Sequence, residues 1–466
     1  MSHWLKVLLS VLSMCCPAAA QRAPATGPLR VLESNPHWFT DGSGKAVYLT
    51  GSHTWQNLQD SGLLRRDDRD PPDAFDYNGY LDFLERHNHN FFRLWRWETP
   101  KWSDKFDGKV KYCRPHPWMR TGPGDARDAK PKFDLTKFDP EYFGRLRTRV
   151  MAGRDRGMYA AVMLFEGWEL QFTDAWNYHP FQRDNNVNGI EADVNGDGQG
   201  TEYNTLQPDD MGRRVLELQL AYVRHVIDTV NDLDNVLYEV CNEALPESTD
   251  WQYYLIRYVK HYEKGKPKQH PAGMTFQYRG GSNRTLYDSP ADWISPNPGE
   301  PVEDYREAPP ASRTTKVVVN DTDHLWGHTG GDSVWVWKSF TRGLNVLFME
   351  ELLPSPTWQD SARVAMGQTR RYAEKMNLAA MVPAGELAAA GYCLAHRGEE
   401  YLVFQPGNKG EFTLNLTEAS GAFSVEWLNV NTGATMPGKH VSGGASRTFT
   451  TPFPGPAVLY LKHVRE

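Results

Sequence analysis

Short apolar runs alternate with longer amphipathic segments along most of the chain, from about residue 30 onward. Residues 158–168 and 235–243 are apolar almost throughout, as buried parallel strands are, whereas 209–232 repeats its apolar residues at helical spacing. We predict eight strands with intervening helices: 46–55, 90–98, 158–168, 235–243, 272–278, 315–321, 345–351 and 378–383. This α/β pattern predicts a (β/α)8 TIM barrel over residues 28–386. A doubly wound open sheet is the alternative, but the Gly-rich phosphate turn that would support it is missing.

The pattern changes after Gly391. From there apolar and polar residues alternate one by one between Gly, Pro and Asn turns, with no helical spacing. We therefore predict a C-terminal antiparallel β-sandwich domain over residues 390–466. Such a module packs against the barrel or binds a partner, and the sequence leaves both open.

The N-terminus has the pattern of a secretory signal peptide over residues 1–20. Lys6 precedes a short apolar run, and small residues end at Ala20. We expect cleavage near Ala20 and export to the periplasm or the medium. The apolar run is too short for a permanent membrane span, and no later segment reaches the roughly 18 apolar residues of a transmembrane helix.

Composition narrows the classes of function. The formal net charge is -7 and the pI is near 6.1, with no long basic run, which argues against nucleic acid as a partner. Aromatic residues make up 12% of the chain, and several Trp residues lie beside polar ones at predicted strand ends. Such rings suit stacking on sugars, although a Trp-rich core would use many of them. After signal removal Cys113, Cys241 and Cys393 remain, which allows one disulfide but implies no disulfide framework or metal knuckle.

Polar and aromatic side chains gather where seven of the predicted strands end, which is where the active site of a (β/α)8 barrel lies. In chain order the candidates are His53, Trp55, Arg93, Trp95, Arg96, Trp97, Glu98, Glu166, Trp168, Asn242, Glu243, Gln277, Tyr278, Asn320, Asp321, Asp323, His324, Trp326, Glu350 and Glu351. A single residue of this kind is more often structural than catalytic. Their repetition at one end of the barrel favours a functional site.

Two carboxylates on facing strands are the groups that glycosidic bond cleavage needs. Glu243 on predicted strand four and Glu350 on predicted strand seven are the pair that the pattern favours. A separation of about 5 Å would predict retention of anomeric configuration, and about 6.5 to 9.5 Å would predict inversion. Alternatively, Glu350 and Glu351 cap the next helix, and Asp321 or Asp323 is the second catalytic carboxylate.

The Asn242-Glu243 pair at the end of strand four, with a carboxylate ending strand seven, resembles the clan A glycoside hydrolases. This resemblance implies a retaining enzyme in which Glu243 is the acid/base, Glu350 is the nucleophile and Asn242 binds the hydroxyl next to the anomeric carbon. In related proteins strand seven often ends in Asp where this chain has Glu350, so the resemblance leaves the nucleophile open.

The ordered set LTGSHTW, FFRLWRWE, VMLFEGW, VVVNDTDHLWG and GYCLAHRGEEYLVFQPG is similar to a narrower group of exported bacterial proteins. Their tail module carries a collagen-binding label, their barrels are assigned as glycosidases, and apiosidases are more distant relatives. The resemblance covers most of the mature chain and implies no particular sugar.

A loop after the third predicted strand resembles the start of a calcium-binding loop. Asp193, Asn195 and Asp197 follow the DxNxDG pattern, but the twelfth position is Asn204 instead of a bidentate Glu. A structural calcium ion is one interpretation, and an Asn/Gly/Asp turn is the other. No other cofactor is expected.

The favoured hypothesis is an exported retaining glycoside hydrolase that acts on a poly- or oligosaccharide. Hydroxyl ligands would be His53, Arg93, Glu166, Asn242, Tyr278, Asp321, Asp323 and His324, and stacking platforms would be Trp55, Trp95, Trp168 and Trp326. The alternative is a non-catalytic protein that binds a carbohydrate or extracellular matrix such as collagen. A protease is a third reading, but no zinc motif or Ser/His/Asp order supports it. The oligomeric state is open.

Overall fold

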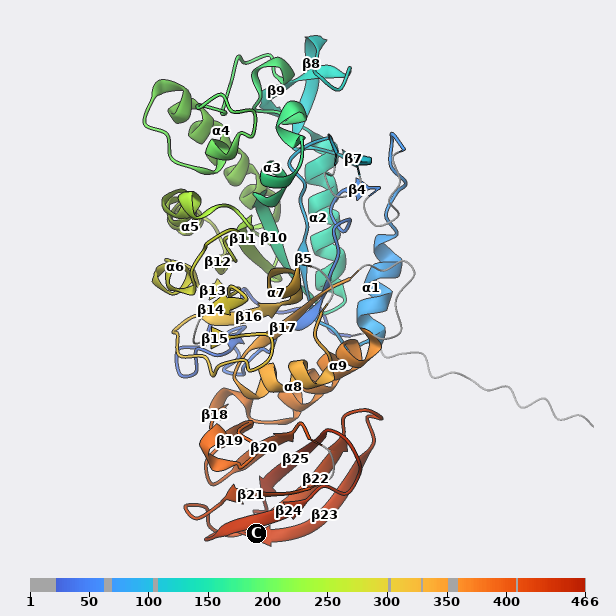
Figure 1. The fold of residues 1–466 in the computed structure, drawn as a ribbon, viewed down its shortest axis with the longest axis vertical. Coiled ribbons are helices and arrows are strands. Elements are labelled where there is room, and N and C mark those ends of the chain that lie inside the picture. The colour runs from blue at the N-terminus through green and yellow to red at the C-terminus, as the bar shows by residue number, and fades with distance from the viewer. Residues whose placement is uncertain are drawn as a thin grey trace, which may run out of the picture.

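The computed structural model describes residues 22–62, 69–103, 108–300, 303–327, 330–350, 359–407 and 410–465. A barrel domain and a C-terminal β domain are stacked along the long axis of the molecule (Figure 1). The predicted signal peptide and Glu351 lie outside the described residues. Among the helices in these ranges, none has both the length and the apolar character of a membrane span.

Eight parallel strands close into a barrel, which confirms the predicted fold class. They are β3 (Thr50–His53), β5 (Phe91–Leu94), β10 (Tyr159–Glu166), β11 (Val236–Asn242), β12 (Ala272–Met274), β13 (Trp293–Ile294), β16 (Val317–Asp321) and β17 (Asn345–Met349). They follow one another around the barrel in chain order, and β17 closes it against β3. The register sets Glu166 beside Asn242 and Met349 beside His53, so the carboxyl ends meet at one rim.

The predicted number of barrel strands, eight, is correct, but the assignment of the strands after the fifth is wrong. The sixth barrel strand is β13, which was not predicted because a strand of two residues is too short to show a hydrophobic period. Residues 315–321 and 345–351 therefore contain strands seven and eight instead of six and seven. Residues 378–383 add no barrel strand, since β18 (Val382–Pro383) pairs antiparallel with β19 (Cys393–His396) in the C-terminal sheet. Glu350 thus follows strand eight.

Helices cover the outside of the barrel (Figure 1). The longer ones are α1 (Tyr77–Arg86), α2 (Pro140–Asp155), α4 (Asp210–Val230), α5 (Thr249–Glu263), α8 (Ser333–Thr341) and α9 (Asp360–Lys375), and the shorter ones are α3 (Trp168–Phe172), α6 (Asn283–Asp288) and α7 (Thr322–Trp326). Aspartates fix where several of them begin. Asp209 accepts a hydrogen bond from the Gly212 backbone N–H at 2.8 Å, and Asp332 accepts one from Trp335 at 2.9 Å.

Small antiparallel sheets decorate the barrel. The longest insertion follows β5 and contains β6 (Lys101–Ser103), β7 (Val110–Arg114), β8 (Trp118–Asp125) and β9 (Pro131–Phe138). β4 (Asp60–Ser61) precedes β5 and pairs with β7. Elsewhere, β1 (Arg30–Val31) pairs with β2 (Phe39–Thr40), and β14 (Gly299–Glu300) pairs with β15 (Glu303–Asp304). Within the insertion, β6 pairs with β7 and carries Trp102, whose ring lies 5.3 Å from that of Trp97. The insertion thereby brings a new aromatic ring to the end of strand two.

The C-terminal domain is built from antiparallel strands, as predicted. One sheet has the order β18, β19, β20 (Glu400–Gln405), β25 (Ala457–His463), β22 (Ala422–Asn429) and β23 (Thr435–Ser442), and a second pairs β21 (Glu411–Asn415) with β24 (Ser446–Thr450). The domain packs on α8 and α9. Trp337 stacks on Phe404 at 6.1 Å, and Gln368 donates to the Val430 carbonyl at 2.9 Å.

Cys113, Cys241 and Cys393 are all described, buried and free. The possible disulfide among them is therefore not formed, and burial raises the pKa of the Cys241 thiol well above its ordinary value. Cys241 acts as a small apolar residue inside strand four.

Candidate active site

A cavity of about 330 Å³ lies at the carboxyl ends of the barrel strands. Its described lining residues are Trp55, Trp95, Trp97, Trp102, Glu166, Trp168, Asn242, Glu243, Tyr278, Asp323 and Gly327. Aromatic rings form most of the wall, and the polar groups come from the ends of strands three, four and seven. This is the position at which barrel enzymes bind their substrates.

Glu243 follows β11 directly and has a left-handed backbone, with φ of 45°. For a residue other than Gly this is an uncommon and strained conformation, and such residues often occur at functional sites. Its side chain is 6% exposed, and no side chain in the described part of the chain donates a hydrogen bond to its carboxyl group. Burial raises the pKa of Glu243 well above its ordinary value, and the charges of Asp323 and Glu166 raise it further. These surroundings favour the protonated form of the Glu243 carboxyl group.

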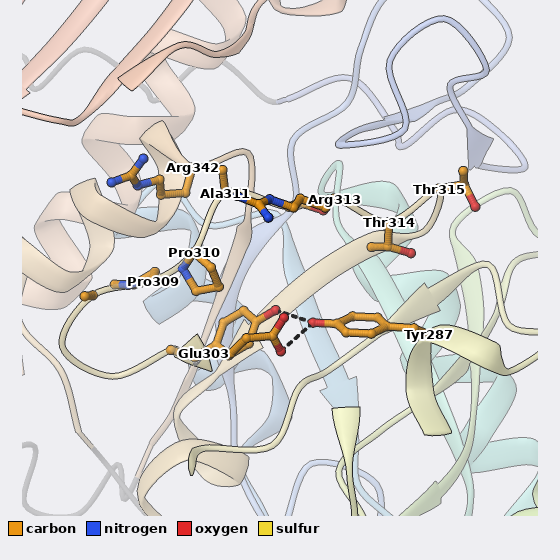
Figure 2. A pocket seen from close by; sticks show the side chains of 12 residues that line it. Tyr287, Glu303, Pro309, Pro310, Ala311, Arg313, Thr314, Thr315 and Arg342 are labelled. Atoms are coloured by element: carbon orange, nitrogen blue, oxygen red, sulfur yellow. Dashed lines mark hydrogen bonds between the residues drawn. The ribbon is translucent and has the colours of Figure 1, made fainter. Parts of the chain in front are cut away.

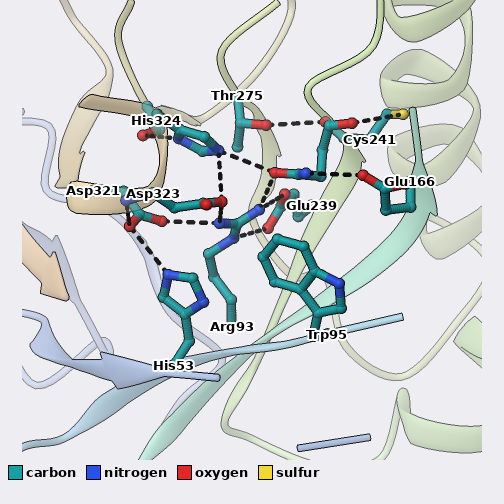
Figure 3. A network of polar contacts seen from close by, with 12 residues as sticks. His53, Arg93, Trp95, Glu166, Glu239, Cys241, Thr275, Asp321, Asp323 and His324 are labelled. Carbon is teal, nitrogen blue, oxygen red and sulfur yellow. Dashed lines mark hydrogen bonds and ion pairs between the residues drawn. The ribbon is translucent and has the colours of Figure 1, made fainter. Parts of the chain in front are cut away.

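Arg93, at the end of strand two, is the centre of the charged network below the cavity (Figure 3). Its guanidinium binds both carboxylate oxygens of Glu239, at 2.7 and 2.6 Å. It also donates to Asp321 at 3.0 Å, to Asp323 at 2.9 Å and to the side-chain oxygen Oδ1 of Asn242 at 2.6 Å. Arg93 is 1% exposed, so its positive charge is fully used by neighbours of the same chain.

The two aspartates after strand seven differ in their surroundings. Asp321 caps α7 through the Asp323 backbone N–H and lies 3.1 Å from His53. Burial alone would raise the pKa of Asp321, but His53 and Arg93 hold it below its usual range. Asp323 lines the cavity, and burial raises its pKa although Arg93 opposes that rise. Of the two aspartates, Asp323 is the one that reaches the cavity.

Asn242 links the strand-three and strand-seven sides of the cavity. Its amide donates to Glu166 at 3.1 Å, and its carbonyl oxygen lies 3.2 Å from the His324 ring. Burial raises the pKa of Glu166 to about 8 and lowers that of His324 well below its ordinary value. Ser295 fixes the other ring nitrogen of His324 at 2.6 Å. Asn242 is thus held in one orientation at the cavity floor.

Glu350 lies in a different environment. It follows β17, is fully buried and is absent from the described cavity lining. Arg363 on α9 donates to both of its carboxylate oxygens, at 2.7 and 2.6 Å. Burial raises the pKa of Glu350, and Arg363 opposes that rise. The geometry of Glu350 is that of a buried ion pair that ties α9 to the barrel.

The structure gathers most of the predicted aromatic residues at the cavity. Trp55, Trp95, Trp168 and Tyr278 line it, whereas Trp326 packs edge-on against Trp335 at 5.4 Å and does not. His53 lies below the cavity and stacks on Trp95, with ring centroids 5.7 Å apart.

Trp97 and Trp102 line the cavity but were not predicted as ligands. The alternation of Arg93, Trp95 and Trp97 gave a signal for Trp97, because alternate residues of an extended segment point the same way. No sequence signal marked Trp102, which reaches the cavity through the inserted sheet.

The predicted calcium loop is an Asx-rich turn. Asp193 accepts hydrogen bonds from the Gly196 and Gly198 backbone at 3.0 and 2.8 Å, and Asn195 donates to Glu202 at 2.6 Å. One carboxylate oxygen each of Asp193, Asp197 and Glu202 lies within 4.8 Å of the others. The calcium ion stays a prediction.

A second cavity, of about 680 Å³, lies between α6, the segment after β15 and Arg342 (Figure 2). There the Tyr287 hydroxyl donates to Glu303 at 2.8 Å and lies 2.9 Å from the Tyr305 hydroxyl. None of the predicted site residues lines this cavity.

Several solved structures have a similar fold. A structure described as a glycoside hydrolase aligns with a TM-score of 0.60 and 12% identity, covering 96% of this chain and 99% of that chain. A family 5 glycoside hydrolase from Bacteroides vulgatus ATCC 8482 aligns with a TM-score of 0.58 and 14% identity, covering 94% of each chain. At such identities the likeness establishes the shared two-domain fold. No protein-family profile and no curated protein sequence matches the chain.

Proposed function

We propose that the protein is a glycoside hydrolase that cleaves O-glycosidic bonds by a retaining mechanism. The observation that carries this proposal is a cavity with aromatic walls that contains two carboxyl groups with different hydrogen-bond partners, Glu243 and Asp323. Glu243 receives no hydrogen bond from a described side chain and has a raised pKa, whereas Asp323 is bonded to Arg93. These surroundings suit Glu243 to carry the proton and Asp323 to act as the carboxylate.

In the first step Asp323 attacks the anomeric carbon while Glu243 protonates the departing glycosidic oxygen. The glycosidic carbon–oxygen bond breaks, and a glycosyl ester forms on Asp323. Glu243, now ionised, then takes a proton from water, and the water oxygen displaces Asp323 from the anomeric carbon. Asp323 provides the charge that raises the pKa of Glu243 most after burial, so the two carboxyl groups act on each other across one cavity.

The other groups of the cavity have supporting roles. Asn242 would bind the hydroxyl next to the anomeric carbon, since Arg93 and His324 hold its amide in place. The apolar faces of Trp55 and Trp168 would stack on the sugar ring. Asp323 takes the nucleophile role first predicted for Glu350, because Asp323 faces the cavity and Glu350 is paired with Arg363.

The test is a screen of purified wild-type protein and Glu243→Gln against aryl glycosides and natural oligosaccharides. We expect wild-type turnover on at least one substrate and a loss of about 100- to 10,000-fold in Glu243→Gln with binding retained. Proton NMR of the first product should show the anomeric configuration of the substrate. Binding without turnover in either protein would instead support the non-catalytic carbohydrate-binding alternative.

We also propose export of the protein, which rests on the signal-like pattern of residues 1–20. N-terminal sequencing of protein from the periplasm or medium should begin near Gln21. Full-length protein confined to the cytoplasm would contradict it.

A further inference from the structure

The described wall of the cavity contains acidic side chains and no basic ones. Glu166, Glu243 and Asp323 contribute carboxyl groups to its wall, and none of the described lining residues is Lys, Arg or His. The remaining lining side chains are aromatic apart from Asn242, and Gly327 adds backbone only. A bound molecule therefore meets carboxyl groups and aromatic rings but no described basic side chain.

The basic side chains near the cavity, Arg93, His324 and His53, already have partners within the chain. Arg93 already binds Glu239, Asp321 and Asp323, so one cation faces three carboxylates. His324 is a neutral ring because burial lowers its pKa, and both of its nitrogens have partners within the chain. His53 is fully buried and bound to Asp321.

The size of the cavity limits what it can hold. Its volume of about 330 Å³ is near the lower end of ligand pockets, which suits the sugar units flanking one glycosidic bond. Trp97 and Trp102 close the strand-two side, and Trp102 is held there by the inserted strand β6. A polymer running through the site would need a longer groove.

We propose, resting on the glycosidase function above, that this cavity accepts the terminal residue of an uncharged glycan and rejects sugars that carry a carboxylate or sulfate. An acidic group bound there would be desolvated near Asp323, and no described lining residue offers a cation to pair with it. Burying an anion without a partner cation costs enough to lower kcat/KM by at least about 100-fold. A hydroxymethyl or hydrogen at the same position carries no such penalty, and its apolar face suits the Trp walls.

The test uses matched pairs that differ only at carbon six, such as aryl glucosides and glucuronides or aryl galactosides and galacturonides, in both anomeric forms. We expect turnover of a neutral member and less than about 1% of its kcat/KM for the acidic partner. Equal or faster cleavage of the acidic partner would overturn the charge argument. If no glycoside is cleaved, the proposed function fails, and calorimetry with the free neutral sugars and uronic acids still tests the cavity: binding of the acids would overturn the inference.

A variant at the rim sharpens this test. Tyr278 is half-buried and lines the cavity, so Tyr278→Arg would supply the missing cation, and Tyr278→Gln is the control that loses the same ring. We expect the acidic-to-neutral ratio of kcat/KM to rise at least about tenfold in Tyr278→Arg but not in Tyr278→Gln. An equal ratio in both variants would show that charge does not set the preference.

A separate experiment tests whether the enzyme removes the terminal residue of a glycan. A neutral aryl oligosaccharide whose non-reducing end is blocked by a cyclic acetal should resist cleavage, whereas the unblocked compound should lose one terminal unit at a time. Internal cleavage of the blocked compound at a similar rate would overturn the terminal-residue part of the proposal.

Discussion

The ends of strands four and eight hold the same residue type in opposite states. Glu243 and Glu350 each follow a barrel strand by one residue, and both are buried. Glu243 faces the cavity with no described side chain donating to it, while Glu350 receives two hydrogen bonds from Arg363. The comparison teaches that position at the catalytic end of a barrel does not by itself decide the role of a carboxylate. Its partners decide whether it reacts or holds the fold together.

The largest expected effect is on activity at strand four. Glu243→Gln removes the proton donor but keeps the size of the side chain, so kcat/KM should fall about 100- to 10,000-fold. Its thermal midpoint should stay the same or rise, because an unpaired buried carboxyl group is lost. Steady-state kinetics and calorimetry check both outcomes, and a fall in stability without a fall in activity would break the comparison.

At strand eight the expected effect is on stability instead of activity. Glu350→Gln leaves Arg363 buried without its main carboxylate, which should cost about 3 kcal/mol of unfolding free energy. The folded fraction should keep kcat within a few-fold, since Glu350 is absent from the described cavity lining. Urea unfolding measures the loss. In the matched control Glu350→Gln/Arg363→Met, which removes both charges, much of the stability should return.

The pH dependence should distinguish the same two residues. Burial and nearby charges raise the pKa of Glu243, and the protonated form is the active one, so kcat/KM should fall as pH rises through that pKa. It should also fall at low pH, where Asp323 becomes protonated. With a substrate whose leaving group needs no acid, Glu243→Gln should lose the alkaline limb, and Glu350→Gln should keep it. An alkaline limb that persists in Glu243→Gln would assign it to another group.

The smallest effect concerns the aromatic wall. Trp102→Ala should raise KM about tenfold with little change in kcat, because it removes an apolar face from bound sugar. Trp326→Ala is the control, since Trp326 packs on Trp335 and does not line the cavity. Equal changes in KM for the two variants would show that the wall is not where sugar binds.

The sequence was sufficient to predict the barrel and the position of Glu243 at the end of its fourth strand. Strands such as β10 and β11 are buried on both faces, and their unbroken apolar runs stand out for that reason. The second carboxylate that we propose, Asp323, was harder to predict, because β13 pairs through only two residues and shifted the numbering of the strands after it. Glu350 matched the strand-seven pattern by number, although the true strand seven ends at Asp321.

The hydrophobic period of a segment does not show which side chains pair across the fold. Nothing near Glu350 in the sequence marks Arg363 as its partner, since that contact depends on how α9 packs against β3 and β17. Trp102 reaches the cavity through pairing of β6 with β7, which a short polar insertion does not reveal. Long-range contacts of this kind decide which carboxylate remains available for chemistry.

The most direct measurement is to trap the glycosyl-enzyme intermediate. A 2-deoxy-2-fluoro glycosyl fluoride of the sugar identified in the screen should inactivate the enzyme, and peptide fragmentation by mass spectrometry should locate the attached sugar. The account predicts the label on Asp323. A label on Glu350 would contradict the central claim that the Arg363-bound carboxylate is structural, and a label on Asp321 would contradict the choice of nucleophile.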